Sequence, residues 1–282
     1  MTNAEIESLK KLCLLSPQEL HRQLVFALRD YGYGANDLII KQRQYIMAAG
    51  DLPVCLIAHL DTVFDQDRCK NKEIYVDTEH QVMWSPQGLG TDDKAGVFAI
   101  LKLLKMGYKP YIIFTQDEEV GCLGAKALVR RFPKSPWKKL KYILQLDRRG
   151  EQDCVFYNCD NPDFTKYVES FGFITDWGSF SDISEIAPAW GIAAANLSVG
   201  YWDEHTYCER VVLSWLEQTI EKVKKMLDVC NEAQKYEYIE IKRPLFDKTI
   251  IDTDICILCG GPIDEAAEYA CVCSTCSAPW HQ

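Results

Sequence analysis

Short hydrophobic runs recur along the chain and predict buried β-strands. The clearest are Val54–Ala58, Tyr111–Thr115 and Leu140–Leu146, and continuous runs of this length are typical of strands covered on both faces. The segments Lys94–Met106 and Ala125–Phe132 alternate with them and predict helices. Buried strands that alternate with helices predict an α/β fold in three layers, in which helices flank a mostly parallel central sheet.

Further elements are predicted on either side of this pattern. Ser16–Glu19 combines an N-cap serine, a proline at the first helical position and a glutamate at N3, which predicts a helix extending to about Asp30. The remaining predictions are strands at 38–47 and 191–199, a hairpin at 73–85, and helices at 161–171 and 209–231.

The pattern divides the chain into three parts. Residues 1–231 form the predicted α/β catalytic domain. The segment 232–252 begins charged and tyrosine-rich and is interpreted as a connector. Residues 253–282 form a small cysteine-rich domain at the C-terminal end of the sequence.

Composition and charge narrow the class of protein. A content of 48% hydrophobic and 26% charged residues is typical of a soluble globular protein, and no apolar run approaches the ~20 residues needed to span a bilayer. The first residues lack the basic and apolar regions of a signal peptide, so we expect a cytoplasmic protein. A formal net charge of −10 argues against binding to nucleic acids or anionic membranes.

Carboxylates and histidines follow the predicted strands in an ordered series. His59 and Asp147 directly follow predicted strand residues, and Asp117 lies two positions after Thr115. In an open α/β sheet, ligands bind beyond the carboxyl ends of the strands. Neutral imidazole and carboxylate ligands are what a water-activating divalent metal requires. Five stretches carry these groups: His59–Asp61, Thr91–Lys94, Asp117–Glu119, Asp147 and His205–Thr206.

Each stretch alone has an ordinary explanation. A single histidine at a strand end is usually structural, and a run of acidic residues is usually a solvated turn. Carboxylates beside the hydrophobic strands Tyr111–Thr115 and Leu140–Leu146 would, however, be costly to bury without a partner. One shared metal site is therefore the favoured interpretation, whereas His21 and His80 lack this setting and are expected to be structural.

These residues resemble two groups of metallopeptidases. Ile57–Val63 resembles the first metal motif of the M20 metallopeptidases, Gly90–Gly96 is similar to the bridging-aspartate motif of their peptidase T branch, and Phe114–Gly121 resembles their catalytic Glu-Glu pair. The stretch 181–206 is closer to the M28 aminopeptidases. The resemblance spans roughly residues 59–209.

The resemblance implies two catalytic zinc ions, for which manganese or cobalt could substitute. The implied ligands are His59 and Asp147 for one ion, Glu119 and His205 for the other, and Asp92 for both.

Two further roles follow from the resemblance. Glu118 would be the general base, and Asp61 would accept the second imidazole N–H of His59 and fix its tautomer. Asp92 rather than Asp93 is chosen by the family pattern, because spacing alone does not decide between adjacent aspartates.

One departure from M20 concerns the lid. M20 enzymes usually carry a lid or dimerisation domain between the last two metal motifs, but the interval from Asp147 to His205 is too short for one. A compact M28-like form with substrate contacts from loops is expected. Candidate substrate-binding residues are Tyr201, Tyr207 and Asp182, with Trp202 and the remainder of Ser179–Asp182 as further rim residues; ordinary packing is an equally open explanation for them.

The cysteines fall into two groups. Eight of the thirteen are scattered from Cys13 to Cys230 and are expected to be free thiols in a reducing compartment. The tail holds two Cys-x2-Cys pairs, which predict a four-thiolate structural zinc ribbon with Cys271 or His281 as alternative ligands. The four expected ligands are Cys256, Cys259, Cys273 and Cys276.

The zinc ribbon is expected to act as a structural clip or a protein-contact module. No Lys or Arg follows Lys248, whereas five acidic residues do, and phosphate binding requires cationic side chains. The sequence as a whole predicts a dizinc peptidase acting on peptide ends. The alternatives are an N-acyl amino acid deacylase, acting on small N-acyl substrates, and a non-catalytic adaptor that uses the ribbon.

Overall fold

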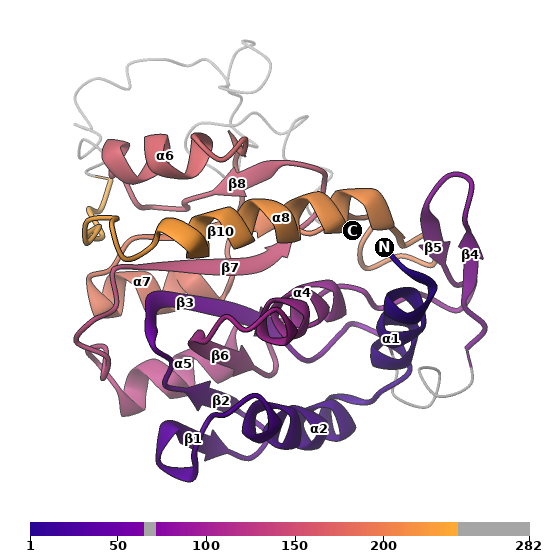
Figure 1. Ribbon diagram of the computed structural model, residues 1–282, viewed down its shortest axis with the longest axis horizontal. Coiled ribbons are helices and arrows are strands. Elements are labelled where there is room, and N and C mark those ends of the chain that lie inside the picture. Colours follow the sequence, from indigo (N-terminus) through magenta and orange to yellow (C-terminus); the bar gives the residue numbers. More distant parts are fainter. Residues whose placement is uncertain (65–71, 242–282) are drawn as a thin grey trace, which may run out of the picture. The chain divides into compact units, whose positions relative to one another are not determined.

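A mixed β-sheet lies at the centre of the structure, and helices cover both of its faces (Figure 1). The computed structural model describes residues 1–64 and 72–241, and the elements lie within the unit Met1–Glu240. The strands of the sheet are β1 (Leu38–Lys41), β2 (Tyr45–Ala48), β3 (Leu52–His59), β6 (Pro110–Thr115), β7 (Tyr142–Arg148), β8 (Asp153–Val155), β9 (Ile174–Thr175) and β10 (Ala194–Ser198).

Among the described residues, the sheet has eight strands in the order β1-β2-β6-β3-β7-β10-β8-β9. The four neighbours β6, β3, β7 and β10 pair in parallel, whereas β1, β2 and β8 pair antiparallel at the two sides. The prediction of a mostly parallel α/β sheet is therefore confirmed. The parallel strands end at one edge, where the candidate ligands were expected.

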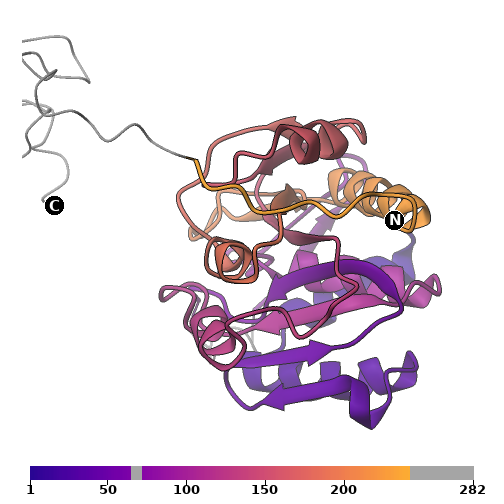
Figure 2. The same ribbon diagram turned by 90° about the vertical axis from the view of Figure 1, so that its left-hand side faces the viewer.

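Helices form the two outer layers (Figures 1 and 2). They are α1 (Asn3–Cys13), α2 (Pro17–Asp30), α4 (Lys94–Lys105), α5 (Leu123–Arg131), α6 (Pro162–Glu169), α7 (Asp182–Trp190) and α8 (Leu213–Val229), with a short 3-10 helix, η1 (Ala35–Asp37). None of these helices is both long and apolar enough to cross a lipid bilayer.

Alternate residues of β3 face two separate hydrophobic cores. Leu56 and Ala58 belong to the core that includes residues of α1, α2, α4, α6 and α8, whereas Cys55 and Ile57 belong to the core with α5 and α7. This alternation follows from the two-residue period of a strand. Because both faces are covered, β3 is buried along nearly its whole length, as its continuous hydrophobic run predicted.

The packing of α4 on β7 brings two of the candidate ligands together. Gly96 lies in the first turn of α4, and a Cβ atom at this position would lie 1.9 Å from the carbonyl oxygen of Leu146. Only glycine permits this close approach. The residue before the helix cap, Asp92, is thereby held beside Asp147, which follows Leu146 in β7.

A second sheet supports the loops around this edge. Its strands are β4 (Tyr75–Asp77), β5 (Val82–Trp84), β11 (Tyr201–Trp202) and β12 (Arg210–Val212), in the order β11-β12-β5-β4 within the described residues. The predicted hairpin is confirmed as β4 and β5. Since β12 pairs with β5, the segment around His205 is tied to the segment that precedes Asp92.

Some elements differ from the sequence predictions. The single strand predicted at 38–47 is a hairpin, because Arg43 adopts a left-handed φ of 58° between β1 and β2. Helix α7 begins at Asp182, the last residue of the predicted rim loop, and neither α7 nor α1 was predicted. The zinc ribbon at 253–282 lies outside the described residues, and the proposed division into a domain, a connector and a ribbon stays a prediction.

Candidate metal centre

His59 is the last residue of β3 and its side chain is 1% exposed. Its Nε2 atom lies 3.3 Å from Oδ1 of Asp147 in the neighbouring strand β7 and 3.1 Å from Oδ1 of Asp92, just before α4. One imidazole nitrogen and two carboxylates therefore converge at the carboxyl edge of the sheet. These residues are the three that were expected to hold the first ion.

Asp92 also contacts the second predicted pair. Its Oδ2 atom lies 3.1 Å from Nε2 of His205, and the same nitrogen lies 2.9 Å from Oε2 of Glu119. The two oxygens of one buried carboxylate therefore face two imidazoles that are distant in the sequence. The structure brings all five predicted metal ligands into one cluster.

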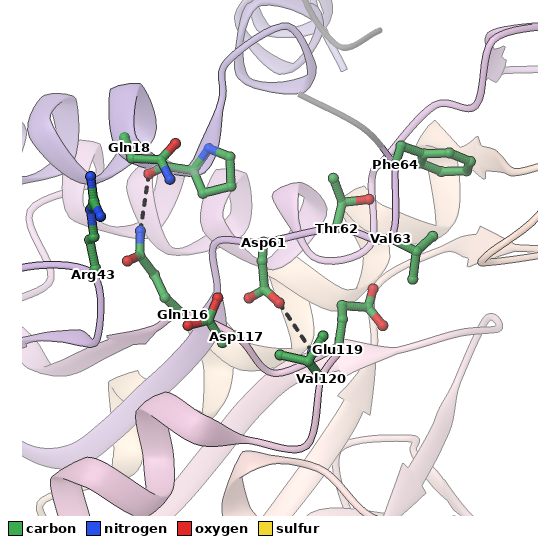
Figure 3. A pocket seen from close by; sticks show the side chains of 11 residues that line it. Gln18, Arg43, Asp61, Thr62, Val63, Phe64, Gln116, Asp117, Glu119 and Val120 are labelled. Carbon is green, nitrogen blue, oxygen red and sulfur yellow. Dashed lines mark hydrogen bonds between the residues drawn. The ribbon is translucent and has the colours of Figure 1, made fainter. Parts of the chain in front are cut away.

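Asp61 connects His59 with the turn after β6. Its carboxylate accepts hydrogen bonds from the backbone N–H groups of Glu118 and Glu119, each at 3.1 Å, and Figure 3 shows the bond to Glu119. Oδ1 of Asp61 also lies 3.4 Å from Nδ1 of His59. This carboxylate fixes the turn that carries the two glutamates and lies beside Nδ1 of His59.

Asp93 has a different environment from Asp92. It is the N-cap of α4 and accepts from the N–H of Gly96 at 2.9 Å, and its other oxygen accepts from the N–H of His59 at 3.1 Å. Both oxygens of Asp93 therefore have backbone donors, whereas those of Asp92 face imidazoles. The peptide bond between the two aspartates is cis.

Glu209 is a buried carboxylate that the sequence analysis did not single out. It accepts from the N–H groups of Gly90, Thr91 and Asp92, at 2.9, 2.5 and 3.1 Å, and from the Thr91 hydroxyl at 2.7 Å. It thus fixes the loop that presents Asp92. In the sequence, Glu209 can be noticed only as an acidic residue shortly after His205. The groups that donate hydrogen bonds to it lie more than a hundred residues earlier.

Three side chains orient Asp147. The Tyr201 hydroxyl donates to Oδ1 at 3.2 Å and to the main-chain oxygen at 3.0 Å, the Ser181 hydroxyl donates to Oδ2 at 3.0 Å, and the amide of Gln145 donates to Oδ2 at 2.9 Å. Tyr201 was predicted to line the substrate pocket. It is buried, and its hydroxyl contacts a candidate ligand.

The other two predicted substrate-binding residues have contrasting positions. Asp182 is fully buried at the start of α7 and accepts a hydrogen bond from the Thr115 hydroxyl, so its carboxylate does not form part of the open rim. Tyr207 is 56% exposed, and its ring lies 6.0 Å from the ring of Phe64. Of these two residues, only Tyr207 is available at the surface.

The buried charges favour positive charge at the cluster. Burial would lower the pKa of His59, but Asp147, Asp61 and Asp92 raise it well above its ordinary value. Contacts with Asp92 and Glu119 raise the pKa of His205 to about 11. Because these carboxylates stabilise protons on both imidazoles, they would equally stabilise divalent cations in place of those protons.

Glu118 is buried beside the cluster but contacts neither imidazole. Burial raises its pKa to about 9, and the neighbouring carboxylates Asp147, Asp182 and Asp92 act in the same direction, whereas His59 opposes them. Cations at the cluster would lower this pKa towards neutrality. A carboxylate with a pKa near neutrality is well suited to accept and return a proton.

Two cavities adjoin the cluster. One, of about 240 Å³, is lined by candidate ligands and by Ser179, Phe180 and Tyr201. The other, which we call the cleft, has a volume of about 870 Å³ and passes Asp61 and Glu119 (Figure 3). Glu119 lines both, so a substrate in either cavity reaches the cluster.

The residues include groups that could hold a metal ion. Potential ligand atoms of His59, Asp92 and Glu119 lie within 4.8 Å of one another, as do those of His59, Asp93 and Asp147. Nδ1 of His59 and Oε1 of Glu119 are buried without a hydrogen-bond partner in the described part of the chain. Imidazole and carboxylate groups are the ligand types found in catalytic zinc sites.

Comparison with known proteins agrees with this arrangement. Residues 40–167 match the family described as Peptidase family M28. The chain is therefore a metallopeptidase that resembles family M28 over these residues. The M28 part of the resemblance is thus confirmed, whereas the M20 part stays a prediction. No curated protein matches the sequence.

Solved structures share the fold. Aminopeptidase PepT from Bacillus cereus has a TM-score of 0.64 at 15% identity, with 80% of this chain and 98% of that chain covered. A tripeptidase from Staphylococcus aureus has a TM-score of 0.63 at 15% identity, with coverages of 81% and 98%. The TET1 peptidase of Pyrococcus horikoshii has a TM-score of 0.59 at 15% identity, with coverages of 79% and 99%.

The structure agrees with the predicted compact form. The interval from Asp147 to His205 holds α6, α7 and short strands, all within the unit Met1–Glu240. No separate lid domain interrupts the described residues in this interval.

Proposed function

We propose that the protein removes residues from the amino ends of short peptides, using two divalent metal ions and Glu118 as the general base. One observation carries the proposal: the two oxygens of Asp92 face His59 and His205 at 3.1 Å each. A carboxylate between two imidazoles is the arrangement required to share one ligand between two cations.

The proposed ligand set follows from the contacts around Asp92. Asp147 completes the side of His59, and Glu119 completes the side of His205. Zinc is the expected metal, with manganese or cobalt as substitutes. When bound, such ions polarise the carbonyl oxygen of a peptide and lower the pKa of water.

Glu118 would move the proton. Its carboxylate would take a proton from the water that attacks the peptide carbonyl carbon. It would then pass this proton to the peptide nitrogen, which leaves as an amine when the C–N bond breaks. Asp61 supports this step because it accepts the backbone N–H of Glu118 at 3.1 Å and thereby fixes the position of the base. Burial of Glu118 keeps its carboxylate away from bulk water.

Action at peptide ends is supported by the names of the structural relatives. They include an aminopeptidase and a tripeptidase. The cleft, at about 870 Å³, has room for a short peptide. We also propose a cytoplasmic location, since the structure shows no disulfide among the described cysteines. We further propose a structural zinc at Cys256, Cys259, Cys273 and Cys276.

The proposal is tested with the full chain after removal of metal by a chelator. Zinc, manganese or cobalt is then returned, and hydrolysis of aminoacyl, unblocked dipeptide and tripeptide, and N-acetyl substrates is measured. We expect hydrolysis of the unblocked peptides only after metal is returned. Asp92→Asn should lower metal affinity and turnover by more than roughly a hundredfold, whereas the exposed Asp163→Asn control should not.

Other outcomes separate the alternatives. Preferential hydrolysis of N-acetyl substrates would identify an N-acyl amino acid deacylase. Absence of hydrolysis with every metal, together with about one zinc per chain, would identify a non-catalytic adaptor. Either result would overturn the peptidase proposal.

A further inference from the structure

A cationic cavity continues from one end of the cleft. It has a volume of about 220 Å³ and is lined by Gln18, His21, Arg22, Gln42, Arg43 and Gln116. We call it the arginine cavity. It shares Gln18, Arg43 and Gln116 with the cleft, so a single molecule can extend from one into the other.

Figure 3 shows the direction of the cleft. Gln18 and Arg43 lie at one end, Thr62, Val63 and Phe64 lie at the other, and Asp61 and Glu119 lie between them. The arginine cavity is therefore reached from the metal cluster by passing Asp61, Gln116 and Arg43. A substrate held at the cluster would place a more distant group near the two arginines.

The described lining of the arginine cavity itself contains no negative charge, whereas the adjoining cleft, which Arg43 shares, is lined by Asp61, Asp117 and Glu119. Arg22 and Arg43 come from α2 and from the turn between β1 and β2, and neither has an ion-pair partner among residues 1–64 and 72–241. None of the lining residues of this cavity is acidic. Two guanidinium groups with free donors are suited to a carboxylate or another planar anion.

His21 provides an independent observation. Its side chain is 7% exposed, and neither ring nitrogen has a hydrogen-bond partner in the described structure. Buried polar groups without partners are rare, and each calls for an explanation such as an absent ligand. The sequence alone predicted a structural role for His21, and the structure adds that both ring nitrogens are buried without a hydrogen-bond partner among the described residues.

Gln116 joins the two cavities. It follows β6 directly, is 3% exposed, and its amide donates to the carbonyl oxygen of Pro17 at 3.3 Å. The same turn continues to Glu118 and Glu119. The arginine cavity is therefore attached to the segment that carries the proposed base and one candidate ligand, so its position relative to the cluster is well defined.

We infer that Arg22, Arg43 and His21 form a subsite for a carboxylate of the peptide substrate, most simply the C-terminal carboxylate of a short peptide whose scissile bond lies at the metal cluster. The inference rests on the proposed function and gives it a substrate class. The substrates would be peptides short enough to reach the metal cluster and the arginine cavity at once. An extended chain spans at most ~3.3–3.6 Å per residue, so the distance between the two places limits the favoured length.

The test compares matched peptides on the metal-loaded full chain. Unblocked tri-alanine is measured as the free acid and as the C-terminal amide, and Ala-Ala-Glu amide is compared with Ala-Ala-Gln amide. The wild-type protein should prefer the free acid in kcat/KM by about tenfold or more. The paired variant Arg22→Gln with Arg43→Gln should remove this preference while hydrolysing the amides at nearly the wild-type rate.

Controls separate charge recognition from general damage. Arg29→Gln, on the same helix α2 but outside the cavity, should retain the preference for the free acid. His21→Gln should weaken that preference. The wild-type protein could also hydrolyse Ala-Ala-Glu amide faster than Ala-Ala-Gln amide. If the paired variant abolishes that difference, the subsite binds an acidic side chain of the peptide.

Binding provides a readout that does not depend on catalysis. Calorimetric titration of the Glu118→Gln variant with tri-alanine free acid should give a lower Kd than with its amide, and the paired arginine substitutions should equalise the two values. Equal binding and equal hydrolysis of acid and amide by the wild-type protein would overturn the subsite. If no peptide is hydrolysed with any metal, the proposed function fails, and a surviving difference in binding would still support the subsite.

Discussion

The carboxylate of Glu209 accepts the backbone N–H of Asp92 at 3.1 Å, across 117 residues of sequence. Its Oε1 atom receives this bond together with those from Thr91, and its Oε2 atom receives the N–H of Gly90 at 2.9 Å. A single buried side chain therefore holds the loop in the shape that presents Asp92 to both imidazoles.

The first prediction concerns this carboxylate. In Glu209→Gln, the amide nitrogen would face a backbone N–H of the loop, so at least one bond becomes a repulsive contact. We expect metal affinity to fall by roughly ten- to a hundredfold and the free energy of unfolding to fall by about 1–3 kcal/mol. Competition with a metal-binding dye and urea unfolding measure the two effects.

The exposed Glu232→Gln substitution is the matched control and should change neither quantity. Unchanged metal affinity in Glu209→Gln, with a folded loop, would show that the position of Asp92 does not depend on Glu209.

The second prediction concerns the base. Glu118→Gln keeps the size of the side chain but removes its ability to accept a proton from water. We expect kcat to fall by roughly 10²–10⁴-fold, while the metal content stays that of the wild-type protein because Glu118 contacts neither His59 nor His205. Steady-state kinetics and elemental analysis test this, with the exposed Glu79→Gln as control. Near-normal turnover would exclude Glu118 as the base.

The third prediction concerns the dependence of stability on pH. Burial would raise the pKa of Glu5, but the N–H of Thr2 and the ammonium group of Lys102 lower it to about 2 from an ordinary value of 4.5. Lys102 lies 3.0 Å from Glu5 and is 9% exposed. A carboxyl group with a lowered pKa stabilises the folded state above its unfolded pKa and loses that contribution as the pH falls through its folded pKa.

The free energy of unfolding of Glu5→Gln should therefore lie below that of the wild-type protein at pH 5–7. The difference should shrink as the pH falls from about 4.5 towards 2. Urea unfolding across this range provides the measurement. Glu7→Gln, which removes an exposed pair with Lys10, is the control and should have little effect at any pH. A difference that grows on acidification would contradict the assignment.

The fourth prediction concerns the cysteine-rich tail. Replacement of Cys256 and Cys259 by serine should remove one zinc ion per chain, from about three to about two, because two of four thiolates would be lost. Peptidase turnover should stay the same. Retention of all the zinc would argue against the proposed ligands, and loss of turnover would show that the tail contributes to catalysis.

The sequence was sufficient for the parts of the fold that depend on local pattern. The continuous hydrophobic run of β3 predicted a strand buried on both faces. The polar residues at the carboxyl ends of β3 and β7, and shortly after β6, predicted the edge near which His59, Glu119 and Asp147 lie. Parallel pairing explains this success, because it brings the carboxyl ends of neighbouring strands together whatever the detailed register.

Long-range contacts explain what the sequence could not supply. Glu209 has an ordinary sequence context, and only the pairing of β12 with β5 shows that it lies beneath the loop of Asp92. The Tyr201 hydroxyl contacts Asp147 from an aromatic stretch that equally fits a pocket lining. Whether Arg22 and Arg43 form ion pairs depends on which acidic residues the fold brings near them. The local sequence pattern does not predict those neighbours.

The cluster draws its side chains from chain segments that only the finished tertiary structure unites. His59 lies early in the sequence, whereas His205 and Glu209 follow most of the sheet. During synthesis, a nascent chain that has not yet released His205 from the ribosome lacks part of the proposed reaction centre. Hydrolysis at the proposed centre would thus require the folded chain, because Asp92 meets His59 and His205 only in the tertiary structure.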